Sequence, residues 1–154
     1  MNSSKISAYP PLSDEYFMDM AIVEAREAFQ EQEVPIGAVV VCRDKVIGKG
    51  HNKTEALHDI TAHAEMIALT AAENYLGSKV LSDCTLYVTI EPCVMCAGAL
   101  RHTRISRVVW GAPEPKYGFT QFGKKILHPT TVIKTGVLEE ECIGLMRSFF
   151  KVRR

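Results

Sequence analysis

Two short motifs constrain this chain more than any other feature. The first is His63-Ala64-Glu65, and the second is Pro92-Cys93-Val94-Met95-Cys96. Together they supply three side chains of the kind that bind zinc, namely His63, Cys93 and Cys96, and one carboxylate that is not needed as a ligand. Structural zinc sites are usually closed by four ligands, whereas catalytic sites keep three protein ligands and an open position. The two motifs therefore predict a catalytic metal site.

Composition sets the wider limits. A chain of 154 residues, 47% of them hydrophobic, is long enough for one domain with a buried core. Its formal net charge is +0, so any binding to nucleic acid must come from a local patch. No apolar stretch approaches the roughly 20 residues of a membrane span, and the polar N-terminus does not resemble a signal peptide. Five cysteines, two of them in C-x-x-C, suit a reducing compartment, so we expect a cytoplasmic protein without membrane contact.

Hydrophobic periodicity and capping signals predict alternating helices and strands. Ser13 caps the first helix, Thr61 caps the second, and Pro92 takes the first position of the third. The expected helices cover residues 13–31, 61–72, 92–100 and 138–154, and the expected strands cover residues 36–41, 46–51, 86–90, 105–110 and 131–134. This order favours a three-layer α/β/α fold around a central mixed five-stranded sheet. Residues 12–154 are expected to form a single domain, preceded by a flexible N-terminus of residues 1–11.

The predicted helices bring the candidate ligands together. Cys93 and Cys96 are spaced i, i+3 in a first helical turn, where the helix N-terminus favours the thiolate that binds metal. His63 lies at the start of another helix, and open α/β sheets collect their ligands at such an edge. Glu65 is placed to exchange a proton with a metal-activated water. This is the chemistry that replaces an exocyclic amine of a nucleobase by oxygen.

Each motif alone has a simpler interpretation. C-x-x-C is also typical of redox pairs or structural zinc, and H-x-E occurs by chance on many helices. Their combination, with a proline before the first cysteine and a helix start at each, favours the catalytic interpretation. The remaining cysteines and histidines are expected to be packing residues or ordinary residues of loops and helix ends: Cys42, Cys84, Cys142, His51, His58, His102 and His128.

The arrangement H-x-E…P-C-x-x-C is a signature of zinc-dependent nucleobase deaminases. From Asp14 to Arg154 the chain resembles the bacterial tRNA-specific adenosine deaminases, which convert adenosine to inosine at the wobble position of the anticodon. The resemblance implies a cytidine-deaminase-like fold, one Zn²⁺ per subunit, a homodimer, and the anticodon stem-loop of tRNA as partner. The matching stretches are residues 33–40, 51–52, 61–65, 86–99, 107–112 and 149–154.

The resemblance also implies roles for single residues. It makes Glu65 the catalytic proton carrier and His63, Cys93 and Cys96 the metal ligands. It makes Asn52 a contact to the flipped base and Ala64 a backbone contact beside the zinc. Substrate contacts are further implied for Glu114, Phe149 and Arg153.

One loop departs from the family pattern. After Ala112 these enzymes usually have an aspartate and a loop rich in alanine and glycine, but this chain has residues 113–122, with two prolines and three aromatic residues. Glu114 is expected to replace the aspartate. The aromatic residues Tyr117, Phe119 and Phe122 either stack on nucleotides or pack on a dimer partner, and we favour packing.

The last predicted helix offers a modest electrostatic signal. Arg147, Lys151 and Arg154 follow a spacing of i, i+4, i+7, opposite an apolar face that includes Cys142 and Phe149. This stripe is either a solvated outer face or a phosphate-binding ridge.

Two other functions remain open: a deaminase of a free nucleobase such as guanine, and a zinc-dependent nucleic-acid-binding module without turnover. The spare carboxylate of Glu65 argues against the second of these.

Overall fold

The computed structural model describes residues 7–153. Residues 1–6 of the predicted flexible N-terminus therefore lie outside the described residues, and Arg154 of the basic stripe lies outside them as well. None of the described helices is long and apolar enough to cross a membrane.

A five-stranded mixed sheet forms the centre of the molecule, with the strand order β2-β1-β3-β4-β5. The first hairpin and the β1–β3 pair are antiparallel, whereas β3, β4 and β5 run parallel to one another. The strands are β1 (Gly37–Cys42), β2 (Lys45–His51), β3 (Cys84–Ile90), β4 (Arg107–Ala112) and β5 (Val132–Thr135). The helices are α1 (Asp14–Gln30), α2 (Ala64–Leu76), α3 (Val94–Thr103) and α4 (Glu139–Val152). This confirms the expected sheet and the expected order of elements.

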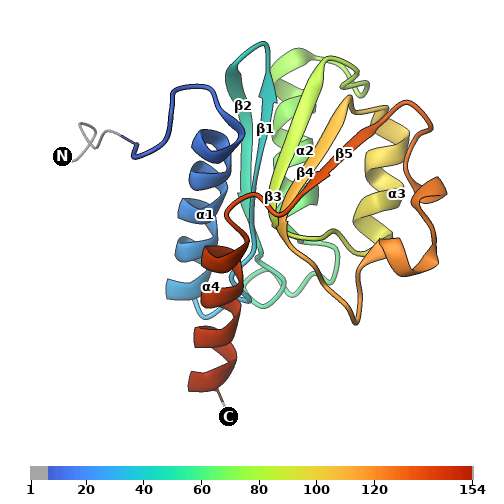
Figure 1. The fold of residues 1–154 in the computed structure, drawn as a ribbon. Coiled ribbons are helices and arrows are strands. Elements are labelled where there is room, and N and C mark those ends of the chain that lie inside the picture. The colour runs from blue at the N-terminus through green and yellow to red at the C-terminus, as the bar shows by residue number, and fades with distance from the viewer. Residues whose placement is uncertain (1–6, 154) are drawn as a thin grey trace.

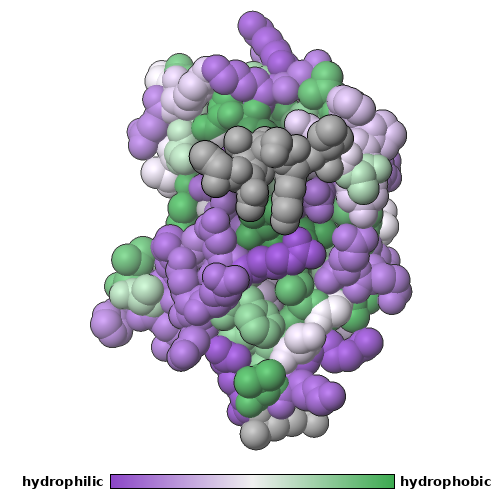
Figure 2. All heavy atoms as spheres, turned by 90° about the vertical axis from the view of Figure 1, so that its left-hand side faces the viewer, coloured by the Kyte–Doolittle hydropathy of each residue, from purple (hydrophilic) through white to green (hydrophobic). Residues whose placement is uncertain are grey.

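Helices cover both faces of the sheet, as the three-layer prediction requires (Figure 1). Strand β1 shows how the layers form, because its side chains alternate between the two faces. Ala38 and Val40 belong to the core cluster that includes α2 and α3. Val39 and Val41 belong to the cluster on the other face, together with α1 and α4. The outer surface of α1 and α4 is mainly hydrophilic, with scattered hydrophobic side chains (Figure 2).

Two glycines of β2 bring α2 unusually close to the sheet. A Cβ atom at Gly50 would lie 2.5 Å from the carbonyl oxygen of Ala64, and one at Gly48 would overlap the carbonyl oxygen of Ala68. Any side chain at these positions would therefore push the helix away from the strand. The glycines fix the depth at which the first turn of α2, which follows His63, lies against β2.

Two predicted helix starts are wrong by one or more residues. Thr61 does not cap α2, because its hydroxyl donates to Asp59 at 2.7 Å and the N-cap residue is His63. Pro92 precedes the start of α3, whose N-cap residue is Cys93. The chain stays extended there because the Pro92 carbonyl accepts the N–H of Phe119, and Cys93 pairs with Gly118.

Candidate active site

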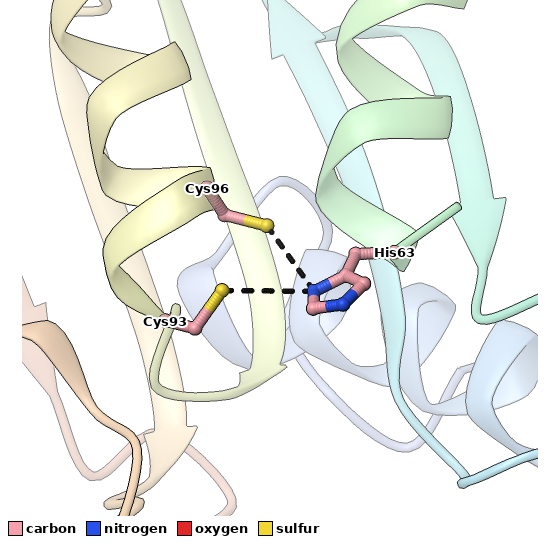
Figure 3. Close-up of side chains that lie close together, drawn as sticks. All are labelled: His63, Cys93 and Cys96. Atoms are coloured by element: carbon pink, nitrogen blue, oxygen red, sulfur yellow. Dashed lines mark hydrogen bonds between the residues drawn. The ribbon is translucent and has the colours of Figure 1, made fainter. Parts of the chain in front are cut away.

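The first residues of α2 and α3 bring the three predicted ligands together. His63 and Cys93 are the N-cap residues of these two helices, and neither side chain caps its own helix. Cys96 lies in the first turn of α3 and is fully buried. The three side chains point toward one another from the two helices (Figure 3). Residues far apart in sequence thus form one cluster, as the motif spacing predicts.

The distances in this cluster fit a tetrahedral zinc ion. The Nδ1 atom of His63 lies 3.7 Å from the sulfur of Cys93 and 3.5 Å from that of Cys96. Typical zinc–sulfur and zinc–nitrogen bond lengths at a tetrahedral angle separate nitrogen and sulfur by about 3.6 Å. One imidazole and two thiolates also match the donor chemistry that zinc prefers. The residues present therefore fit a three-ligand zinc site.

Hydrogen bonding within the cluster favours the thiolate form of Cys93. The Cys96 thiol and the His63 imidazole, in that order of importance, lower the pKa of Cys93 to about 4. The same hydrogen bond, together with burial, raises the pKa of the Cys96 thiol far above its ordinary value. The bond to Cys93 also raises the pKa of His63. Binding of a metal cation to these three side chains would displace the protons of the thiols.

Glu65 is buried beside this cluster, in the first turn of α2, with 4% of its surface exposed. Burial raises the pKa of its carboxyl group to about 7. A carboxyl group with such a pKa can both accept and donate a proton near neutral pH. Its position agrees with the predicted role, which itself stays a prediction.

A cavity of about 600 Å³ opens at this end of the sheet and reaches the cluster. Such a volume lies within the range of small-molecule and cofactor pockets. Most of its wall is apolar, whereas the charged and polar groups are few. It is lined by Val34, Ile36, Asn52, Thr54, Ile60, His63, Ala64, Glu65, Ile90, Glu91, Cys93, Met95, Glu114, Tyr117, Met146 and Phe150.

The predicted substrate contacts divide into two groups. Asn52, Ala64 and Glu114 all line the cavity. Asn52 is 7% exposed, and its side-chain amide makes no hydrogen bond to any of the described residues, so it is free to bind a ligand. One carboxylate oxygen of Glu114 accepts two backbone N–H groups of its own loop, at 2.8 and 3.3 Å, so this side chain also orders the loop.

Phe149 and Arg153 lie away from the cavity wall. Phe149 is buried between helices and packs edge-on against Phe29 of α1 at 5.8 Å. The Arg153 guanidinium stacks on the Phe149 ring at 3.7 Å. The neighbouring Phe150 lines the cavity instead. Helical geometry explains the difference, because adjacent residues point about 100° apart and only one can face the cavity.

The aromatic loop is split in the same way. Phe119 is fully buried against Trp110, with ring centroids 5.6 Å apart. Tyr117 is 61% exposed at the rim of the cavity, and Phe122 is 67% exposed. Of the three aromatic residues, therefore, Phe119 is part of the hydrophobic core, Tyr117 can contact a ligand in the cavity, and Phe122 is exposed outside the cavity lining.

His51 differs from the prediction that it is an ordinary residue of a loop or of a helix end. It ends β2 and is buried, not part of a loop or helix end. Its two ring nitrogens lie 3.0 Å from carboxylate oxygens of Glu24 and Glu31, both from the α1 side. The contact lowers the pKa of Glu31. The sequence did not predict this cluster because its members are separated by a strand and a turn.

The other histidines, apart from His63, do not belong to the cluster of candidate metal ligands. Cys42, Cys84 and Cys142 pack in or against the core as expected.

Among α/β/α proteins, one histidine and two cysteines beside a buried glutamate define the zinc-dependent nucleobase deaminases. Residues 11–112 match the profile of the cytidine and deoxycytidylate deaminase zinc-binding region, and the chain belongs to this family.

Several relatives are similar over most of this chain. The tRNA-specific adenosine deaminase of Bacillus subtilis (strain 168) is 44% identical over 92% of this chain and 91% of its own length. The chloroplastic tRNA(adenine(34)) deaminase of Arabidopsis thaliana is 41% identical over 97% of this chain, which spans only 13% of that longer protein.

Solved structures give the same picture of the fold. A structure from work on A-to-I editing by tRNA deaminases at the wobble position of transfer RNA is 41% identical, with a TM-score of 0.80. The match covers 84% of this chain and 98% of that one. A guanine deaminase from Bacillus subtilis is 36% identical, with a TM-score of 0.64, over 67% of this chain and 66% of its own.

Proposed function

We propose that this protein is a zinc-dependent hydrolase that converts adenosine to inosine at the wobble position of tRNA. One observation carries the proposal: Glu65 lines the same cavity as the cluster of His63, Cys93 and Cys96. This site lies in a chain of which 92% matches the tRNA-specific adenosine deaminase of Bacillus subtilis. The solved structure from the wobble-editing work matches this chain with the higher TM-score of the two structures compared, 0.80 against 0.64. We further propose that residues 12–154 are a single deaminase domain with one zinc ion.

In this proposal the chain's own residues carry the protons. His63, Cys93 and Cys96 hold the zinc, which when bound supplies Lewis-acid activation of water. Glu65 takes a proton from the attacking water and gives it to the ring nitrogen beside the attacked carbon, and it then carries the second proton of the water to the exocyclic nitrogen, which leaves as ammonia. Water and adenosine thus become inosine and ammonia, and Glu65 returns to its starting state.

The base itself is proposed to enter the cavity flipped out of its stack. The unpartnered amide of Asn52 offers both a donor and an acceptor to the base edge. Ala64 lies next to the ligand His63 and lines the cavity, so its backbone is placed to contact the base near the reacting carbon. Ile36, Ile90 and Met95 supply the apolar surface against which a purine ring can pack.

RNA phosphates are proposed to lie along α4. Arg147, Lys151 and Arg153 are exposed on this helix, and Arg147 and Lys151 make no ion pair with the described residues. The cavity-lining residues Met146 and Phe150 belong to the same helix, which supports a substrate that contacts both the cavity and the helix. Glu114 is proposed to contact the substrate backbone through the carboxylate oxygen that its own loop does not use.

Deamination of free guanine is the second candidate, favoured by the similarity to a guanine deaminase structure. A single assay separates the two. Purified protein is incubated with tRNA, with an anticodon stem-loop, and with free adenosine, cytidine and guanine, and the products are separated by chromatography. We expect inosine in the RNA and little turnover of free bases. Xanthine formation from guanine with unmodified RNA would contradict the proposal, and no turnover of any substrate would favour the non-catalytic zinc module.

We also propose a homodimer in the cytoplasm. The family resemblance and the exposed aromatic side chains Tyr117 and Phe122 support the dimer, because such side chains are enriched in interfaces. Five free cysteines support a reducing compartment. Light scattering at micromolar concentration tests the dimer, and a mass of one chain would contradict it.

A further inference from the structure

Two buried carboxylates outside the metal cluster each bind one loop of the cavity wall. Glu33, between α1 and β1, is 1% exposed, and Glu91, between β3 and α3, is 7% exposed. A carboxylate buried to this degree is costly unless hydrogen bonds satisfy it. Each of these two is satisfied by backbone N–H groups of a loop that carries cavity-lining residues. Figure 1 shows both loops at the same end of the sheet.

Glu33 holds the loop between β2 and α2. Its two carboxylate oxygens separately accept the N–H groups of Glu55 at 3.1 Å and Ala56 at 2.7 Å. The same loop carries Thr54 and Ile60, which line the cavity. Backbone hydrogen bonds within the loop shape its turns, and the two bonds to Glu33 attach the loop to the segment between α1 and β1.

Glu91 holds the loop that follows β4. One oxygen accepts the N–H of Glu114 at 3.1 Å, and the other accepts the N–H and the hydroxyl of Thr120 at 3.0 and 2.8 Å. Gly118 packs so closely that a Cβ atom there would overlap the Glu91 carboxylate. The loop carries Glu114 and Tyr117 to the cavity.

We infer that Glu33 and Glu91 are positioning residues that fix the two cavity loops for an RNA substrate. The inference rests on the proposed function, because a large substrate must contact the cavity rim as well as its floor. Neither carboxylate carries a proton in the reaction. Their contribution is to keep the loops ordered before the substrate arrives, which lowers the entropy lost on binding. The expected signature is therefore a higher KM when either is changed, with little change in kcat.

The test uses Glu33→Gln and Glu91→Gln, which keep side-chain size but replace one accepting oxygen by an amide donor. Hydrogen exchange followed by mass spectrometry should show about tenfold faster exchange in residues 53–60 for the first variant and in residues 113–122 for the second. KM for the anticodon stem-loop should rise about tenfold in each, while kcat changes less than about threefold and zinc content stays at the wild-type value. Unchanged exchange in the corresponding loop would overturn the inference.

Two milder substitutions at Thr120 serve as controls in case the glutamine variants fail to fold. Thr120→Val removes only the hydroxyl donor to Glu91, whereas Thr120→Ser keeps it. We expect a smaller rise in KM for the valine variant and wild-type behaviour for the serine variant. Equal behaviour of the two, a fall in kcat at constant KM, or loss of zinc in the glutamine variants would each overturn the positioning role. Failure of the wild-type protein to deaminate RNA would instead contradict the proposed function, while the exchange measurement would still test whether the carboxylates hold the loops.

Discussion

Arg107 and Asp14 form a two-pronged ion pair between β4 and the start of α1. The guanidinium nitrogens lie 3.1 and 3.0 Å from the two carboxylate oxygens, and Lys134 and Tyr87 donate to the same carboxylate. Burial alone would raise the pKa of Asp14, but these donors outweigh it and hold the pKa well below its ordinary value. The pair therefore links the first helix to the sheet in a pH-dependent way.

Asp14→Asn should lower the free energy of unfolding at pH 7 by about 1–2 kcal/mol, a value already reduced for solvent screening. A depressed pKa contributes stability above the unfolded pKa of about 3.9 and loses it as the pH falls through the folded pKa. The difference between wild type and variant should thus shrink below about pH 4. Urea unfolding at several pH values measures it, with Asp19→Asn on the same helix as the control. A difference that stays constant down to pH 2 would contradict the assignment.

Removal of a metal ligand should remove the zinc. Cys93→Ser and Cys96→Ser are expected to bind far less than the about one zinc per chain of the wild type. Because metal binding contributes to folding, the melting temperature should fall as well. Elemental analysis and thermal unfolding measure both effects. Cys42→Ala, at a half-buried cysteine far from the cluster in sequence, should keep its zinc, and full zinc in the Cys93 variant would refute the ligand assignment.

Glu65→Gln should keep the zinc and the fold while losing turnover. The amide can hydrogen-bond water but cannot shuttle its proton, so the loss should be at least the roughly 10²–10⁴-fold typical of general acid–base groups. Single-turnover assays on RNA together with zinc analysis provide the measurement. Glu73→Gln lies on the same helix and should behave as wild type. Near-normal activity of the Glu65 variant would assign the proton transfer to another group.

Charge reversal on α4 should weaken RNA binding without touching the chemistry. Arg147→Glu with Lys151→Glu should lower affinity and reduce the salt dependence by up to about one unit of log–log slope per lost phosphate contact. Binding at several salt concentrations, beside zinc content, is the measurement. Lys79→Glu, just beyond the far end of α2, is the matched control. If turnover and binding survive the double reversal, the helix does not hold phosphates, and the free-base alternative gains support.

Gly50→Ala should destabilise the fold and disturb the site together. Its Cβ atom would press on the carbonyl of Ala64, and overpacking of this kind costs about 1–3 kcal/mol. Zinc affinity and turnover should fall with stability, because α2 starts at that contact. Gly144→Ala is the control, since a Cβ atom there meets nothing within 4 Å. Wild-type stability of the Gly50 variant would show that α2 has room to move.

The sequence was sufficient for the order of elements and for the metal cluster. The apolar run in β1 and the two motifs are local signals, and the layers follow from them. The helix starts at His63 and Cys93 were misplaced because a histidine and a cysteine occupy the N-cap positions, where a serine, threonine, aspartate or asparagine is normally expected. Glu33, Glu91 and His51 were missed for a different reason. Each is buried by partners far away in the chain, and nothing in its own neighbourhood distinguishes it from an exposed charged residue.

Helices α2 and α3 each begin at a proposed zinc ligand, His63 and Cys93, and neither N-cap side chain caps its own helix. With zinc bound as proposed, the ion holds the two first turns in place. A chain that lacks zinc would expose the uncapped N–H groups of both turns and open them more often. Proteases cut such openings, so copies without metal should be degraded faster than loaded ones. The steady-state amount of this protein would then follow the zinc supply, even at a constant rate of synthesis.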